Sequence, residues 1–273
     1  MAQGVWEMLD NNPATRQTVA DEKDLYQRHN SGRVFRFTGV PISGWEELDN
    51  NPATIDIVAD GGNLYQRHNS GRVFRFTGVP ITGWELLDNN PATVDIVAGG
   101  GNLYQRHNNG RIFRFTGPAV AGWQELDRNP ATVDIAASGG LLYQRHNNGR
   151  VFRFTGTPLT GWEELDRNPA TVDIVADGGL LYQRHNNGRV FRFTGVPISG
   201  WEELDRNPAT VQIAAGGGNL FQRHNSGRVF RFTGVPITGW EELDHNAATV
   251  DIVAAGGQLY QRHNTGAVFR FVG

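Results

Sequence analysis

The chain contains 273 residues, of which 38% are hydrophobic and 10% are aromatic, and its formal net charge is −3. A sequence pI of about 6.2 argues against the basic surface of a nucleic-acid-binding protein. The chain has no cysteine, which excludes a disulfide framework, a thiolate metal site and a cysteine nucleophile. Because many secreted proteins also lack disulfides, the composition leaves the cellular compartment undetermined.

The first residues, Met1 to Glu7, do not combine a basic segment with an apolar one, so we expect no signal peptide in this chain. No apolar run approaches the roughly 20 residues that a membrane-spanning helix needs. The sequence therefore predicts no membrane insertion.

A unit of 39 residues recurs along the chain, and seven such units account for all 273 residues. An open stack of repeats would need polar capping units at its ends. Near-equal units without caps indicate a closed ring instead. The tryptophans that mark the period are Trp6, Trp45, Trp84, Trp123, Trp162, Trp201 and Trp240.

One repeat contains four short runs typical of β-strands, at 54–59, 64–68, 72–77 and 84–88. Glycine, asparagine and proline separate the runs, and Asn109-Gly110 is a tight-hairpin signal in a later copy. No segment has an apolar period long enough for a helix. The fold class predicted is therefore all-β: a seven-bladed β-propeller with four antiparallel strands per blade.

The whole chain, 1–273, is expected to be a single propeller domain. The chain begins with an outermost strand, so the N-terminal strand should complete the C-terminal blade and close the ring. The expected blades are about 13–49, 52–88, 91–127, 130–166, 169–205, 208–244, and 247–273 together with 1–10.

Charged residues inside the predicted strands need partners. Asp56 lies in the middle of an innermost strand and Arg75 lies between two phenylalanines. An unpaired buried carboxylate is costly, so we expect an Asp–Arg pair within a blade or between neighbours. The aspartate recurs as Asp95, Asp134, Asp173 and Asp251, and is replaced by Gln17 and Gln212 in the other two repeats. This replacement favours a structural role over a catalytic one.

The order of these signals resembles the tectonin and tachylectin group of β-propeller lectins. The resemblance lies in Leu64-Tyr65, Asn69-x-Gly71, the run 73–78, and Trp84 with Leu87, and it recurs in every repeat. It implies carbohydrate binding at sites on one rim of the ring or in grooves between blades. The segment 66–69 is not part of the family pattern, so the resemblance does not identify the sugar.

One rim of the ring should combine the glycine-rich turn of each blade with the loop that leads to the tryptophan. Glycine allows close approach of a ligand, asparagine offers a polar fork, and an indole can stack on a sugar; the alternative is that each tryptophan packs against the next blade. The expected ligand-binding residues are Trp45, Trp84, Trp123, Trp162, Trp201, Trp240, Gly62, Asn63, Gly101, Asn102, Gly140, Gly179, Gly218, Asn219, Gly257 and Gln258.

The copies differ at this rim. Residues 21–24, Asp-Glu-Lys-Asp, replace the glycine turn in the first repeat, so we expect the weakest site there and about six working pockets in total. Phe221 replaces the tyrosine of the other repeats, which removes one hydroxyl from one pocket.

The remaining polar residues favour no metal and no catalytic centre. Each repeat has one histidine in the same position, without a second metal ligand at a suitable spacing, so a structural role is expected. The run Asp88-Asn89-Asn90 has some features of a calcium loop but lacks further acidic ligands. We therefore expect neither an enzyme nor a cofactor.

The leading interpretation is a multivalent lectin that binds glycans or glycoconjugates as a monomeric ring. The alternatives are a protein-interaction scaffold, and an engineered or consensus-derived propeller without a selected ligand. Near-identical copies also arise by recent duplication, so their recurrence is not itself evidence of a conserved function.

Overall fold

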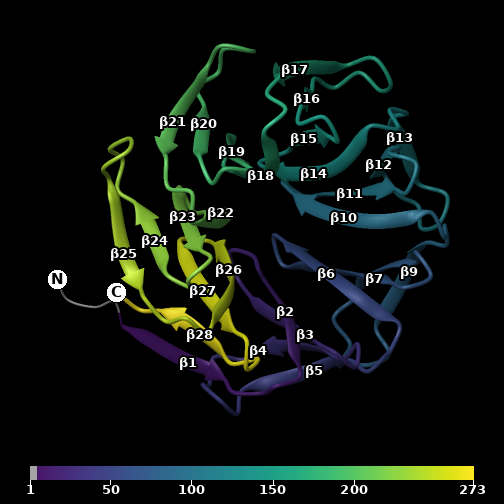
Figure 1. Ribbon diagram of the computed structural model, residues 1–273. Coiled ribbons are helices and arrows are strands. Elements are labelled where there is room, and N and C mark those ends of the chain that lie inside the picture. Colours follow the sequence, from purple (N-terminus) through teal and green to yellow (C-terminus); the bar gives the residue numbers. More distant parts are fainter. Residues whose placement is uncertain (1–4) are drawn as a thin grey trace.

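The computed structural model describes residues 5–273, which form seven four-stranded antiparallel sheets arranged in a ring (Figure 1). This confirms the predicted all-β, seven-bladed β-propeller. Each sheet is one blade, with its strands A to D in order from the central axis to the outside. No helix long and apolar enough to cross a membrane occurs among residues 5–273.

The strands follow the 39-residue period. Blade 1 contains β2 (Thr15–Ala20), β3 (Leu25–His29), β4 (Val34–Phe37) and β5 (Trp45–Asp49). Blade 2 contains β6 (Thr54–Asp60), β7 (Asn63–His68), β8 (Val73–Phe76) and β9 (Trp84–Asp88). Blade 3 contains β10 (Thr93–Gly99), β11 (Asn102–His107), β12 (Ile112–Phe115) and β13 (Trp123–Asp127). Blade 4 contains β14 (Thr132–Ser138), β15 (Leu141–His146), β16 (Val151–Phe154) and β17 (Trp162–Asp166).

The other three blades repeat this pattern. Blade 5 contains β18 (Thr171–Asp177), β19 (Leu180–His185), β20 (Val190–Phe193) and β21 (Trp201–Asp205). Blade 6 contains β22 (Thr210–Gly216), β23 (Asn219–His224), β24 (Val229–Phe232) and β25 (Trp240–Asp244). Blade 7 contains β26 (Thr249–Ala255), β27 (Gln258–His263), β28 (Val268–Phe271) and β1 (Trp6–Asp10).

The two ends of the chain close the ring in blade 7. Strand β1 pairs antiparallel with β28, so that Trp6 lies opposite Phe271 and Glu7 opposite Arg270 (Figure 1). The Arg270 guanidinium donates to the Glu7 carboxylate at 2.5 Å. The N-terminal strand therefore completes the C-terminal blade, as predicted; the first four residues of the predicted segment 1–10 lie outside the described residues.

The hydrophobic core lies between neighbouring blades. At the junction of blades 1 and 2, buried Tyr26, Val34 and Leu48 from one sheet pack against Ile57 and Leu64 from the next. Side chains alternate between the two faces of a strand, so both faces of a blade can be apolar and each face meets a neighbour. Equivalent clusters recur around the ring, and each blade is stabilised by two neighbours.

The connections between strands define two rims. We call the edge with the A–B turns and C–D loops the first rim, and the edge with the B–C turns and D–A loops the second rim. On the first rim each C–D loop reaches the preceding blade: the Ile81 amide and the Trp84 indole both donate to the Leu48 carbonyl, at 2.8 and 3.0 Å. The loop is thereby fixed across the junction of two blades.

On the second rim a carboxylate at the end of strand D joins several blades to the next, as at the junction of blades 2 and 3. The Asp88 carboxylate accepts a hydrogen bond from the Gln105 amide at 2.9 Å, and Thr93 donates to the Gln105 amide oxygen at 2.9 Å. Asp88 is buried, and the Asn90 side chain accepts from the Ala92 backbone amide in the following turn. These oxygens of the loop considered for calcium therefore serve the junction between blades 2 and 3.

Deleting residues 1–10 should destabilise the fold strongly, because it removes β1 and leaves β28 as an unpaired edge. Leu9→Ala is the local form of this test: Leu9 is fully buried, so we expect a loss of roughly 2–5 kcal/mol in the free energy of unfolding. Met8→Ala on the exposed face of β1 is the control and should change it by only about 0.5 kcal/mol. Urea denaturation measures both. A truncated chain that melts within a few degrees of the intact one would contradict closure by β1.

Candidate binding site: the grooves between blades

Grooves open on the first rim where two blades meet. One lies between blades 6 and 7 with a volume of about 410 Å³, and another lies between blades 7 and 1 with a volume of about 470 Å³. The residues that line them occupy equivalent positions of the repeat. The first is lined by Asn219, Phe221, Arg231, Gly257, Gln258, Leu259, Arg270, Phe271, Val272 and Gly273. The second is lined by Lys23, Asp24, Leu25, Arg36, Phe37, Thr38, Gly39, Tyr260 and Arg270.

Arginines from strand C of blades 6, 7 and 1 line these grooves. Arg231 lies opposite Phe221 across strands B and C, and Arg270 lies opposite Tyr260 in the next blade. Arg231 donates to the Glu241 carboxylate of strand D at 2.6 Å, and both side chains are partly exposed. Each guanidinium is therefore fixed in place and retains donors toward the groove.

The equivalent arginine of blade 2 has a partner, as the sequence predicts, but the partner is a glutamate of strand D and not an aspartate. Arg75 and Glu85 form an ion pair at 2.6 Å. In blade 3 the acid is replaced, and Arg114 donates instead to the Gln124 amide oxygen at 2.8 Å. The arginine of blade 3 is therefore held in place without being neutralised by its strand D partner.

The predicted glycine turns border the grooves and the mouth of the central channel. Asn219, Gly257 and Gln258 line the groove between blades 6 and 7, and Gly218 lines the channel mouth. The turns need glycine because two consecutive residues adopt positive φ angles, as Gly62 does at 86°. The other predicted turn residues, Asn63, Gly101, Asn102, Gly140 and Gly179, occupy the same repeat positions.

The predicted tryptophans are placed differently. Trp84 is partly buried and packs with Phe76 at a centroid distance of 5.2 Å. Its indole N–H donates a hydrogen bond to the Leu48 carbonyl of the preceding blade. Among the described residues, the linings of the two grooves contain phenylalanine and no tryptophan. The same indole contact is made by Trp45, Trp123, Trp162, Trp201 and Trp240. The structure thus shows the inter-blade contact, and a role as ligand platform stays a prediction.

The first repeat keeps a groove despite its altered turn. Asp21 accepts the backbone amides of Lys23 and Asp24 at 2.8 Å, and Lys23 donates to the Gly61 carbonyl of blade 2 at 3.1 Å. Lys23 and Asp24 also line the groove between blades 7 and 1. This groove therefore differs in charge from the groove between blades 6 and 7. The latter is lined by Phe221, so it is the groove that lacks the hydroxyl of the tyrosine found in the other repeats.

The central channel is lined by the A strands. Small and aliphatic side chains from all seven blades enclose a volume of about 350 Å³. Toward the second rim, Asp56 pairs with Arg67 at 3.5 Å, which confirms the predicted Asp–Arg pair within a blade. The same pair recurs between Asp95 and Arg106, Asp134 and Arg145, Asp173 and Arg184, and Asp251 and Arg262.

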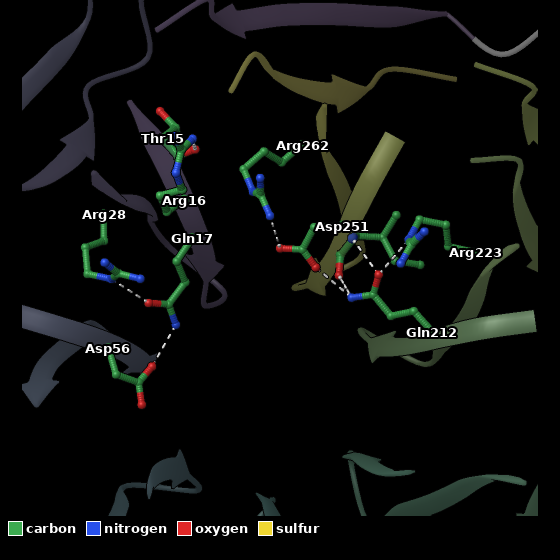
Figure 2. Close-up of polar contacts among 10 residues, drawn as sticks. Thr15, Arg16, Gln17, Arg28, Asp56, Gln212, Arg223, Asp251 and Arg262 are labelled. Atoms are coloured by element: carbon green, nitrogen blue, oxygen red, sulfur yellow. Dashed lines mark hydrogen bonds and ion pairs between the residues drawn. The ribbon is translucent and has the colours of Figure 1, made fainter. Parts of the chain in front are cut away.

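Glutamine takes over this position in blades 1 and 6 (Figure 2). The Gln17 amide donates to Asp56 at 2.8 Å and to the Ile57 carbonyl at 3.1 Å, and its oxygen accepts from the Ile57 amide at 3.2 Å. Arg28 then donates to the Gln17 oxygen at 3.1 Å. Glutamine therefore binds the exposed backbone edge of the next blade without adding a charge.

The aspartates of the channel interact unfavourably as anions. The pKa of Asp134 is raised to about 6: burial is the largest cause, Arg145 lowers the pKa, and the neighbouring carboxylates of Asp173 and Asp95 raise it. Burial also raises the pKa of Asp95 and of Asp173. The ionised form of Asp134 is thus less stable in the folded ring than in the unfolded chain.

The repeated histidines are buried beside the second rim. His107 stacks on Phe113 at a centroid distance of 4.4 Å, and burial lowers its pKa. Within residues 5–273, no three histidine or acidic side chains gather in a way that could hold a metal ion. The contacts of His107 are therefore those of a core residue.

Asp134→Gln should stabilise the protein at neutral pH by on the order of 1 kcal/mol, because it removes a carboxylate whose pKa is raised. The pKa in the folded state, about 6, lies above the ordinary 3.8, so the penalty develops as pH rises from about 4 to about 6, is complete above 6, and disappears as pH falls below 4. Gln212→Asp is the matched reverse change and should destabilise at pH 7. Urea denaturation at pH 4 and at pH 7 measures the free energy of unfolding of both variants. A stabilisation by Asp134→Gln that is independent of pH would contradict the raised pKa of Asp134.

Trp84→Phe should lower the free energy of unfolding by about 1–3 kcal/mol, since it removes the indole donor to Leu48 and part of the packing. Thermal melting and ligand titration distinguish the two roles of this residue. Lost stability supports the inter-blade contact, whereas lost binding with an unchanged melting temperature would show a ligand platform.

No family model matches the sequence, and no curated protein matches it. Solved structures of other propellers are similar in fold. Virginiamycin B lyase from Staphylococcus aureus is 18% identical, with a TM-score of 0.74, over 98% of this chain and 99% of that one. YCF48 bound to a D1 peptide is 16% identical, with a TM-score of 0.71, over 100% and 98%. Yeast RCC1 (Prp20) bound by Kap60 is 10% identical, with a TM-score of 0.68, over 94% and 80%. These likenesses show the fold and leave the function to the site.

Proposed function

We propose that this protein is a non-enzymatic, multivalent interaction scaffold whose grooves on the first rim bind a protein partner. The observation that carries the proposal is the groove between blades 6 and 7, where Arg231 and Arg270 flank an aromatic wall and the turn residue Gln258. Its equivalent recurs between blades 7 and 1. A ligand site repeated around a ring is suited to binding several segments of one partner, or several partners.

An extended polypeptide fits the chemistry of these grooves. A peptide backbone offers carbonyl groups to the free guanidinium donors, and its side chains can contact Phe271 and Leu259. Similar propellers support this class of ligand, since YCF48 was solved with a D1 peptide and yeast RCC1 with Kap60. A millimolar contact contributes only about 4 kcal/mol, but several on one rigid ring raise avidity by roughly 10² to 10⁴.

Glycan binding is the second candidate. The amide groups of Asn219 and Gln258 lie in one groove with the ring of Phe271, and amide forks beside an aromatic ring are suited to sugar hydroxyls and the apolar sugar face. The resemblance to the tectonin and tachylectin lectins supports the same ligand. A propeller without a selected ligand is the third possibility, in which the grooves would bind neither.

The test uses a peptide array and a glycan array, followed by titration calorimetry with the strongest ligand to count equivalents per chain. The double variant Asn219→Trp, Gln258→Trp fills the groove between blades 6 and 7, so the number of equivalents should fall while the affinity of the remaining sites is unchanged. Ser226→Trp, at an exposed position of a B–C turn on the second rim, is the matched control. Peptide binding that depends on the groove supports the scaffold; glycan binding with the same dependence would replace it with the lectin, and no binding at all would overturn both.

A further inference from the structure

In three blades, two arginines on the second rim form ion pairs with the same glutamate. In blade 3 the Glu125 carboxylate accepts from Arg111 with one oxygen and from Arg128 with the other, the latter at 2.8 Å. Glu125 is only 14% exposed, whereas the Arg111 and Arg128 side chains are 40% and 67% exposed. The carboxylate is therefore hidden beneath two guanidinium groups that face the solvent.

Blades 4 and 5 repeat this arrangement. The corresponding groups are Arg150, Glu164 and Arg167, and Arg189, Glu203 and Arg206. We call the six arginines of blades 3 to 5 the arginine arc.

A phenyl ring fixes the first arginine of each pair. The Arg111 guanidinium lies 5.3 Å from the centre of the Phe113 ring, and Arg150 lies 5.2 Å from Phe152. Arg189 makes the same contact in blade 5. An exposed arginine normally loses rotamer freedom when it binds a ligand. These side chains are already held by a carboxylate and an aromatic face, so that loss is reduced.

Among residues 5–273, the other blades lack a glutamate that is shared by two arginines. In blade 1 a single arginine, Arg33, donates to both oxygens of Glu47 at 2.5 and 2.6 Å, and Asn50 occupies the position equivalent to Arg128. Blade 6 has the same bidentate pair between Arg228 and Glu242. In blade 2 the acid is absent, and Arg72 donates to the Asn89 side chain. Blade 7 has Met8 and Ala267 at these positions.

Other charged groups near the arc are turned inward. Asp127 is 8% exposed and accepts the Arg128 backbone amide at 2.9 Å. His107 is buried, and burial lowers its pKa, which favours the neutral form at pH 7. The outer layer of the second rim in blades 3 to 5 therefore consists of guanidinium donors above buried carboxylates, although the chain as a whole has a net charge of −3.

We propose that the arginine arc is a docking surface for an acidic polypeptide segment, whose carboxylates accept the guanidinium N–H groups left free by the glutamates. Each of blades 3 to 5 places two exposed guanidinium groups over one largely buried carboxylate, so the arc matches carboxylates spaced along a flexible chain. A nucleic acid carries a denser charge and requires a more basic domain. The arc lies on the opposite rim from the grooves, so a loss of binding at the arc can be distinguished from a loss of binding at the grooves.

The test compares the wild-type chain with the triple variant Arg128→Asn, Arg167→Asn, Arg206→Asn. Asparagine already occupies this position of the repeat at Asn50 and Asn89, so the substitution is compatible with the fold. We expect polyglutamate to bind the wild type with an affinity that decreases with salt, and to bind the triple variant about tenfold more weakly. Equal binding by both proteins, or no binding by the wild type, would overturn the proposal.

Two further variants separate the shared glutamate from simple charge. Asn50→Arg adds an arginine beside Glu47 and Arg33, whereas Asn11→Arg adds the same charge in blade 7, where Met8 replaces the glutamate. Asn50→Arg should raise the affinity for polyglutamate about threefold, and Asn11→Arg should raise it less. An equal rise in affinity for the two variants would mean that polyglutamate responds to net charge alone, which would contradict a role for the shared glutamate. Heparin or single-stranded DNA bound more tightly than polyglutamate at the same arginines would overturn the assignment to a polypeptide.

Discussion

Every blade is attached to the preceding one at one backbone carbonyl. Leu48 accepts both the Ile81 amide and the Trp84 indole, and this requires Ile81 to adopt a φ of 68°. A branched residue in that region costs on the order of 1–3 kcal/mol, which the two hydrogen bonds, each worth about 1 kcal/mol, offset. The C–D loop is therefore fixed over the junction, and the groove beside it keeps a defined shape without a ligand.

The period, the strands and the closure of the ring could be predicted from the sequence, because they depend on local turn residues and on a whole number of repeats. An Asp–Arg pair at Asp56 could also be predicted, since a charge inside a strand needs a partner, but the sequence did not show that the partner is Arg67. The role of Trp84 could not, because packing and ligand stacking require the same residue. The part of Arg231 in the groove depends on how two blades face each other, and a single repeat carries no information on that.

Differences between the copies are more informative than their similarities, because recent duplication explains the similarities. Gln17 replaces an aspartate in the channel and instead binds the backbone of Ile57, so a carboxylate is not required there for folding. Asn50 and Arg128 likewise occupy equivalent positions in different blades. The scaffold therefore tolerates polar changes on its surfaces and in its channel, while the apolar residues between blades remain nearly unchanged.

Because polar substitutions are tolerated on the surface, the two rims expose different charged groups. The first rim combines uncharged C–D loops with grooves in which arginines are paired, whereas the second rim exposes guanidinium groups in three consecutive blades. Because the strands of each blade separate the rims, a ligand on one rim leaves the other accessible. Rigid junctions also keep neighbouring sites at fixed separations, so a partner with matching spacing gains avidity that a flexible chain of the same modules would lose. Selectivity for a partner would then depend on spacing and charge pattern around the ring more than on the affinity of any one site.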